Sequence, residues 1–332
     1  MSAMDYIDLF CGIGGFHQAA NQVGSRRGLP LRCVFASDID PECRRAYEHN
    51  YGLAPIGDIR TVEPSDIPDH DLLFAGFPCQ PFSIIGDLRG FDDTRGTLFF
   101  EIARILQEKK PKAFILENVK MLVGHQQGRT LARITETLHD LGYSVTYRVL
   151  NALDFGLPQK RERVFIVGFR DPSPFVWPHG GVPMKPLREL LEPEVHPRYL
   201  ASEAIRRSRA EWHTKEGQPT IWHENKAGNV SKYPYSCALR AGASYNYLLV
   251  DGERRLTERE MLRLQGFPDT FEIVCNHSQT RKQAGNSVPV PMVASVLDRV
   301  LDALQSHGGY PLASQSHEQL EFVMEKRWKN RD

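Results

Sequence analysis

The cysteine at position 79 stands in a setting that favours covalent chemistry. It lies in the segment 76–83, Gly-Phe-Pro-Cys-Gln-Pro-Phe-Ser, directly after an apolar run at residues 71–75 that is typical of a buried strand. Open α/β sheets carry their reactive groups beyond the carboxyl ends of their strands, and the two flanking prolines restrict this loop. A lone cysteine is usually a small buried hydrophobic residue, but the polar and rigid neighbours of Cys79 reverse that preference. The sequence therefore predicts that Cys79 is a nucleophile.

Two further polar segments adjoin predicted strands. Glu117 follows the apolar run 113–116 and precedes Asn118, and a carboxyl group whose pKa is raised by burial is suited to donate a proton or hydrogen bond to a ring nitrogen. Residues 159–163, Gln-Lys-Arg-Glu-Arg, open the strand predicted at 164–169. Because side chains alternate along a strand, Arg161 and Arg163 are predicted to share one face. An exposed charged strand end is the alternative interpretation of this segment.

A glycine-rich turn follows the first predicted strand, at residues 6–10. The sequence Phe-Cys-Gly-Ile-Gly-Gly at 10–15 precedes a helix, so main-chain N–H groups and close backbone approach are available to a ligand. Asp38 follows the strand predicted at 31–36 and is placed to bind ribose hydroxyl groups. The pair predicts a nucleotide-like cofactor and suits NAD equally well. A tight turn without any ligand is the structural alternative.

These segments must be positioned by a sheet of mostly parallel strands covered by helices. Residues 5–170 alternate apolar runs with amphipathic stretches, among them a helix predicted at 96–109, which indicates an α/β fold with a doubly wound sheet. After residue 171 prolines become frequent and periodicity fades up to about residue 247. Met292, Val296, Val300 and Leu304 restore a helical period, and we expect that helix to pack on the first domain.

Composition limits the classes of protein that this chain can be. The 332 residues are 41% hydrophobic and 25% charged, with a formal net charge of zero, so any binding of nucleic acid requires a local basic surface. No apolar run is long enough for a membrane helix, and residues 1–10 lack the features of a signal peptide, so we expect a cytoplasmic protein. The six cysteines form neither a CxxC pair nor a zinc-ligand cluster, and we expect no metal.

Taken in order, these segments resemble the carbon-5 cytosine-specific DNA methyltransferases, especially the compact bacterial members of restriction-modification systems. The match comprises the glycine turn, Asp38, residues 57–59, the segment around Cys79, the Glu-Asn-Val at 117–119, residues 159–165 and the Gln-Ala-Gly-Asn-Ser-Val at 283–288. The resemblance implies a Rossmann-like methyltransferase fold, with a catalytic and cofactor-binding domain at 1–171 and 276–332. It implies a smaller, irregular target-recognition domain with its hinge at 172–275.

The resemblance also implies that S-adenosylmethionine is the cofactor and S-adenosylhomocysteine the product. Asp38 would bind the ribose, Ile39 would pack on the adenine, and residues 58–59 would contact the adenine edge. The expected cofactor-binding residues are Phe10, Gly12, Gly14, Gly15, Asp38, Ile39, Asp58, Ile59, Pro78, Leu98, Asn286 and Ser287.

For catalysis, the resemblance implies that Cys79 adds to carbon 6 of a flipped-out cytosine in double-stranded DNA. Glu117 would hold ring nitrogen 3, Arg163 the carbonyl oxygen, and Arg161 a phosphate or the same edge of the base. The expected DNA-binding residues are Ser83, Ile85, Arg89, Arg240 and Tyr245. We expect a functional monomer, with a cognate restriction endonuclease as its genetic companion.

Three other functions compete with this interpretation. An NAD-dependent dehydrogenase would use the glycine turn and Asp38 but leaves Cys79 and residues 159–163 without a role. The tRNA-modifying branch of the family carries a late Cys-Phe-Thr tripeptide, which this sequence lacks. A DNA-binding regulator without activity would not need Cys79, Glu117 and Arg163 together.

Overall fold

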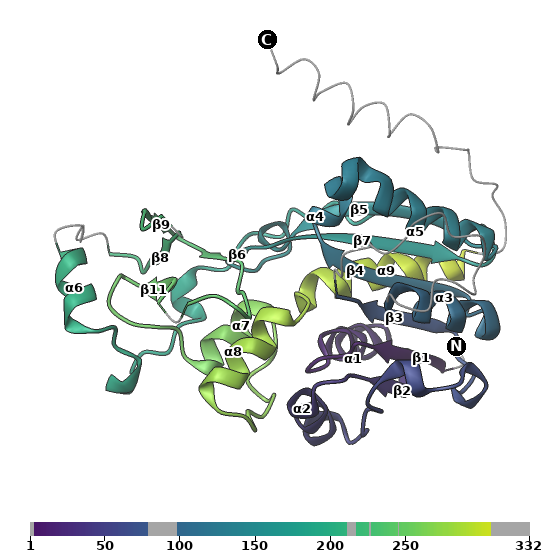
Figure 1. The fold of residues 1–332 in the computed structure, drawn as a ribbon, viewed down its shortest axis with the longest axis horizontal. Helices are drawn as coiled ribbons and strands as arrows, with labels where there is room; N and C mark the ends of the chain where they lie inside the picture. The colour runs from purple at the N-terminus through teal and green to yellow at the C-terminus, as the bar shows by residue number, and fades with distance from the viewer. Residues whose placement is uncertain (1–2, 79–97, 211–216, 226, 245, 307–332) are drawn as a thin grey trace, which may run out of the picture.

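The computed structural model describes residues 3–78, 98–210, 217–225, 227–244 and 246–306. A large body built on one central sheet and a smaller body with short strands lie at opposite ends of the molecule (Figure 1). Within these ranges no helix is long and apolar enough to span a membrane.

The central sheet has six strands in the order β2-β1-β3-β4-β7-β5. The first four are parallel, whereas β7 runs antiparallel to both β4 and β5. This arrangement confirms the predicted α/β class and the mostly parallel sheet, and every strand predicted from the sequence is present with ends shifted by a few residues. The strands are β1 (Met4–Leu9), β2 (Leu31–Ser37), β3 (Leu72–Gly76), β4 (Ala113–Val119), β5 (Ser144–Asn151) and β7 (Glu162–Phe169).

Strand β5 is missing from the sequence-based prediction for a physical reason. It lies at the edge of the sheet, and Leu150 is its single buried residue. The continuous apolar run that marks strands covered on both faces is therefore absent here.

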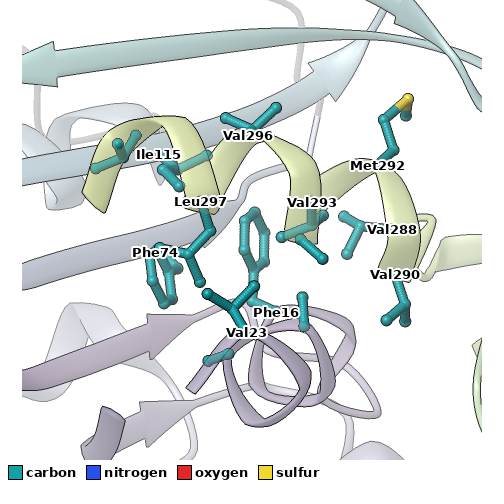
Figure 2. Close-up of a cluster of buried hydrophobic side chains, with 14 of the residues drawn as sticks. Phe16, Val23, Phe74, Ile115, Val288, Val290, Met292, Val293, Val296 and Leu297 are labelled. Atoms are coloured by element: carbon teal, nitrogen blue, oxygen red, sulfur yellow. The ribbon is translucent and has the colours of Figure 1, made fainter. Parts of the chain in front are cut away.

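One face of the sheet is covered by α1 (Gly15–Arg27) and α9 (Val290–Gln305). Phe74 and Ile115 point from the strands into this core, where they meet side chains of both helices (Figure 2). The predicted return of the C-terminal helix to the first domain is thereby confirmed, since α9 packs along α1.

The opposite face carries a second core beneath α3 (Leu98–Lys109) and α5 (Arg129–Asp140). Leu73 and Phe114, the sequence neighbours of residues in the first core, point to this side. Alternating side chains thus bury both faces of the sheet, as a doubly wound architecture requires. The helix expected at 96–109 corresponds to α3 over its described part. Two shorter helices follow β2 and β4, namely α2 (Pro41–Tyr51) and α4 (Met121–Gly124).

The smaller body has a hydrophobic cluster of its own, formed mainly by residues 187–264. A three-stranded antiparallel sheet in the order β11-β8-β9 contributes to it, and β10 pairs in parallel with β6 from the large body. The elements are β6 (Gln159–Lys160), α6 (Glu203–Ala210), β8 (Ile221–Glu224), β9 (Val230–Tyr233), β10 (Ser236–Cys237) and β11 (Leu248–Val250).

The segments that join the two bodies share residues with both cores. In α7 (Glu258–Gln265), Leu264 belongs to the cluster of the smaller body, whereas Leu262 packs into the α1/α9 core. Trp177 also packs into that core, and its Nε1 donates to Oγ1 of Thr146 at 3.2 Å. The domain boundaries expected at 171/172 and 275/276 therefore remain predictions. The helix after the second boundary is α8 (His277–Asn286), whose Ala284 packs with the smaller body.

Candidate active site

The carboxyl ends of β1, β3 and β4 meet at one edge of the sheet. Gly76 at the end of β3 pairs with Glu117 on β4, and Val119 at the end of β4 pairs with Arg163 near the start of the antiparallel β7. Three segments that are far apart in the sequence are thereby placed side by side. The topology explains the placement, because an antiparallel neighbour begins where the parallel strands end.

Glu117 and Arg163 form an ion pair at this edge, with Nε of Arg163 2.8 Å from Oε1 of Glu117. The two side chains are only 9% and 13% exposed, so little water screens the pair. Burial raises the pKa of the Glu117 carboxyl, and the guanidinium groups of Arg163 and Arg161 oppose this shift without cancelling it. The arrangement yields a carboxyl group that can hold a proton at a higher pH than an ordinary glutamate.

Asn118 fixes the chain that leads to residue 79. Its Nδ2 donates to the carbonyl oxygen of Phe77 at 2.9 Å, and its own Oδ1 accepts from the N–H of Val119 at 2.8 Å. Asn118 is buried, so the link is shielded from water. Residue 79 itself lies outside the described residues, as do the other predicted sites Ser83, Ile85, Arg89 and Tyr245.

Arg161 differs from the expectation that it contacts a DNA phosphate or the base. Its side chain is buried and donates to the main-chain carbonyl oxygens of Leu239 at 2.8 Å, Gly285 at 2.9 Å and Ser287 at 2.7 Å. All three acceptors belong to the protein, so in this structure Arg161 ties segments from both bodies to β7. Arg161 lies between β6 and β7 and belongs to neither strand, so the two arginines do not share a strand face as predicted, and only Arg163 forms an ion pair with Glu117.

The glycine turn adopts backbone conformations that explain its composition. Phe10, Gly12 and Gly14 all have positive φ angles, of 54°, 55° and 81°. A Cβ atom on Gly14 would lie 2.3 Å from the ring of Tyr51, and one on Gly15 would lie 2.6 Å from Cγ2 of Val288. A Cβ on Gly12 would meet nothing within 4 Å, so this residue faces open space at the edge of the sheet.

Asp38 holds this turn in place. One carboxylate oxygen accepts from the N–H of Gly12 at 2.8 Å, and the other accepts from the N–H of Asp40 at 2.8 Å. Burial raises the pKa of Asp38, and these two hydrogen bonds oppose the shift. Its neighbour Ile39 is 68% exposed, an unusual position for a large apolar side chain directly after a core strand.

The other expected cofactor residues divide between exposed and buried positions. Asp58 accepts from the N–H of Arg60 at 3.0 Å and forms an ion pair with the Arg60 side chain, which holds its pKa below the usual range. Ile59 is buried beside the α3/α5 core, Leu98 is partly buried against it, and Pro78 is exposed.

The late segment 285–288 lies against the glycine turn. Asn286 is exposed at the end of α8, and Ser287 directly after it is buried. A Cβ atom on Gly15 has no room, because it would collide with Val288 and lie 3.0 Å from Oγ of Ser287. Two segments separated by most of the chain are thus adjacent.

Tyr51 supports the glycine turn, a role that the sequence does not indicate. The hydroxyl of Tyr51 donates to the carbonyl oxygen of Gly14 at 3.1 Å, and its ring stacks on His17 with centroids 4.0 Å apart. Burial lowers the pKa of His17 to about 4, so the imidazole is neutral at neutral pH. A tyrosine at helical spacing in α2 reads as an ordinary core residue, and no pattern in the sequence connects it to the turn.

Arg240 lies in the smaller body with its side chain exposed. Its N–H donates to the hydroxyl of Tyr247 at 2.8 Å, and its guanidinium carbon lies 4.9 Å from the centre of the same ring. The residue is therefore held by its neighbour at both the main chain and the side chain.

The mostly parallel sheet with an acidic residue after β2, and a buried carboxyl–guanidinium pair at the same edge, are features of an α/β enzyme with a nucleotide-like cofactor. A model of the family "C-5 cytosine-specific DNA methylase" matches residues 4–302. The chain belongs to this family and is a DNA (cytosine-5-)-methyltransferase. No cluster of metal-binding side chains occurs within the described ranges.

Relatives of the chain agree with this assignment. It is 58% identical over 290 residues to the Type II methyltransferase M.NgoBI of Neisseria gonorrhoeae, covering 86% of this chain and 90% of that relative. It is 53% identical over 301 residues to the Type II methyltransferase M.HaeII of Haemophilus aegyptius, covering 90% and 93%. The fold resembles that of the S. pombe Dnmt2 methyltransferase, with a TM-score of 0.68, 21% identity and coverage of 91% and 99%.

Proposed function

We propose that this enzyme methylates carbon 5 of a cytosine that is flipped out of a short, specific duplex DNA site. The methyl donor is S-adenosylmethionine, and the reaction passes through a covalent adduct with Cys79. The observation that carries the proposal is the buried ion pair of Glu117 and Arg163, beside the chain that Asn118 holds next to residue 79.

The residues around the glycine turn fit S-adenosylmethionine. Asp38 offers a carboxylate for ribose hydroxyl groups, exposed Ile39 offers an apolar surface for a purine, and Gly12 leaves space for close approach. When bound, the cofactor supplies an electrophilic methyl group. Asp58, Ile59, Pro78, Leu98, Asn286 and Ser287 are proposed to complete the pocket.

The protein side chains divide the chemistry among them. The thiolate of Cys79 adds to carbon 6, and the electron pair displaced from the carbon 5–carbon 6 double bond moves into the ring. Glu117 donates a hydrogen bond or its proton to nitrogen 3, while Arg163 binds the carbonyl oxygen, so the developing negative charge is stabilised. Carbon 5 would then take the methyl group as the bond from that methyl to the sulfonium sulfur breaks, so that S-adenosylhomocysteine would leave with the electron pair. Loss of the carbon 5 proton to water returns electrons to the ring and expels Cys79.

Extraction of the cytosine from the duplex costs a few kcal/mol, which contacts with the DNA must offset. We propose that Ser83, Ile85 and Arg89 provide contacts around the vacated position. Sequence specificity is assigned to residues 172–247, with Arg240 and Tyr245 among the residues that contact DNA. By analogy with the Type II relatives, the enzyme protects DNA against a companion endonuclease, and it acts as a cytoplasmic monomer.

A fluorinated substrate tests the covalent step. Bisulfite sequencing of DNA from cells that express the chain first identifies the methylated site. A duplex with 5-fluorocytosine at that site should form a stable adduct with the wild-type enzyme and S-adenosylmethionine. The fluorine on carbon 5 cannot be removed as the proton is, so the last step is blocked. Cys79→Ala should bind the same duplex without an adduct. Methylation by Cys79→Ala would overturn the mechanism.

Calorimetry tests the cofactor independently of DNA. We expect the folded protein to bind S-adenosylmethionine and not NAD. Binding of NAD in the micromolar range, or no binding of S-adenosylmethionine, would refute the cofactor assignment.

A further inference from the structure

Helix α8 lies between the proposed cofactor site and a segment of the smaller body. Its two sides make different sets of polar contacts, one to residues beside Asp38 and one to residues 239–244. The arrangement of α2, α8 and the smaller body can be followed in Figure 1.

On the cofactor side, Lys282 and Gln279 contact Asp40, and Nε2 of Gln283 donates to the carbonyl oxygen of Glu42 at 3.1 Å. Nζ of Lys282 lies 2.7 Å from Oδ2 of Asp40, and Nε2 of Gln279 donates to the same oxygen at 3.3 Å. The N–H of Asp40 in turn donates to Asp38, the residue that also holds Gly12. Lys282 is therefore linked through Asp40 to Asp38, the residue that is proposed to bind the ribose.

On the recognition side, α8 is fixed to the main chain of residues 239–244. Nη1 of Arg281 donates to the carbonyl oxygen of Ala243 at 2.7 Å. A Cβ atom on Gly285 would lie 2.4 Å from the main-chain nitrogen of Ala241, so helix and segment are in direct backbone contact. The guanidinium of Arg161 joins Gly285 to Leu239 through their carbonyl oxygens.

We propose that α8 couples cofactor binding to DNA recognition, with Lys282 as the positioning residue that connects the helix to Asp40. The inference rests on the proposed function. A ligand that immobilises Asp38 and Asp40 also immobilises α8 through the ion pair. The segment that carries Arg240 then loses less conformational entropy when it binds DNA, which gives positive coupling without a change of fold.

Lys282→Met removes the ion pair without touching a group that contacts the substrates. Asp40→Asn provides a second variant, because asparagine can still cap α2, where Asp40 accepts from the N–H of Glu42 at 2.9 Å. Lys282→Arg preserves the charge and should rescue the coupling. The matched control is Lys112→Met, because Lys112 and Asp71 form an ion pair of the same 2.7 Å length. The exposure is also similar, at 53% for Lys112 and 24% for Asp71 compared with 50% for Lys282 and 18% for Asp40.

Hydrogen exchange of the full-length protein provides a readout that requires no DNA. S-adenosylhomocysteine should slow amide exchange in peptides that cover residues 239–244 in the wild type, in Lys282→Arg and in Lys112→Met. In Lys282→Met and Asp40→Asn the ligand should still protect the glycine turn, and protection of residues 239–244 should be lost. If Lys282 only stabilised the fold, its substitution would reduce protection of both the glycine turn and residues 239–244.

The coupling itself is measured as the ratio of DNA dissociation constants without and with S-adenosylhomocysteine, on the duplex that the wild type methylates. We expect a ratio of about 5 or more in the wild type, which is in the range typical of coupled sites. In Lys282→Met the ratio should be close to one. At saturating substrates kcat should be preserved, while KM for DNA rises. A wild-type ratio of one, or an unchanged ratio in Lys282→Met, would overturn the inference. Failure of the wild type to bind S-adenosylhomocysteine would instead refute the proposed function, and the inference with it.

Discussion

Arg163 lies beside Glu117 because an antiparallel strand enters a sheet that is otherwise parallel at this edge. Their contact of 2.8 Å joins β7 to the end of β4, with both side chains shielded from water. Burial raises the pKa of Glu117, and the guanidinium limits that rise. The acidity of the proposed proton donor is thus set by two opposing influences, and each can be changed by one substitution.

Glu117→Gln should remove the acid and preserve the shape of the side chain. Because the protonated carboxyl is the active form, wild-type kcat should fall as pH rises through the raised pKa of Glu117. The variant should lack this decline and have a kcat lower by about 10²- to 10⁴-fold. Single-turnover methylation over a pH series that starts near the ordinary pKa of a glutamate and extends upward measures both effects. A variant that keeps the wild-type pH profile would assign the acid to another group.

Arg163→Met should shift the same pH dependence in a predictable direction. The guanidinium lowers the pKa of Glu117, so its removal raises that pKa further and moves the decline in kcat to higher pH. We also expect kcat to fall about 10²- to 10³-fold, since a donor to the carbonyl oxygen is lost. Arg170→Met, just beyond the far end of β7, is the control that should change neither quantity. A shift to lower pH in Arg163→Met would contradict the electrostatic account.

Arg161→Met should destabilise the protein because three buried carbonyl oxygens lose their donor. The expected loss in free energy of unfolding is roughly 3–5 kcal/mol, as for removal of one partner from a buried charged network. Urea denaturation measures it, with Arg161→Lys expected to be intermediate. A loss below about 1 kcal/mol would show that the contacts add little to stability.

Gly168→Ala should destabilise the central sheet through overpacking. Gly168 on β7 pairs with Phe114 on β4, and an added Cβ would lie 2.1 Å from the phenylalanine ring. We expect a loss of about 1–3 kcal/mol in thermal or urea unfolding. Gly124→Ala is the matched control, because a Cβ there meets nothing within 4 Å. Equal stability of the two variants would show that the ring of Phe114 can move aside at little cost.

Arg240→Ala should change sequence preference at one base pair. If the exposed guanidinium makes two hydrogen bonds to a guanine edge, its loss should reduce discrimination there by about 1–3 kcal/mol. Methylation of a randomised site library by wild type and variant, followed by sequencing, measures the preference. Uniformly lower activity with an unchanged preference would indicate a phosphate contact. An unchanged preference after exchange of the whole 172–247 segment with that of a relative of different specificity would refute the location of the recognition region.

The sequence by itself determines the central architecture and the glycine turn. Apolar runs of strand length are a local property of buried strands, and glycines at 12 and 14 meet a backbone requirement with positive φ angles. Chemistry-bearing residues at strand ends could therefore be identified one segment at a time. The edge strand β5 lacks the continuous apolar run of the central strands and shows only an alternation, with Val145, Tyr147 and Val149 against the core, which is a weaker signal.

The tertiary structure alone decides which of these residues meet. Arg161 and Arg163 are equivalent in the sequence pattern, yet one binds three main-chain carbonyl groups and the other pairs with Glu117. Tyr51 beneath the glycine turn and Lys282 on Asp40 are likewise invisible in the sequence. Their partners lie far away along the chain, and only the packing of helices on the sheet brings them within hydrogen-bonding distance.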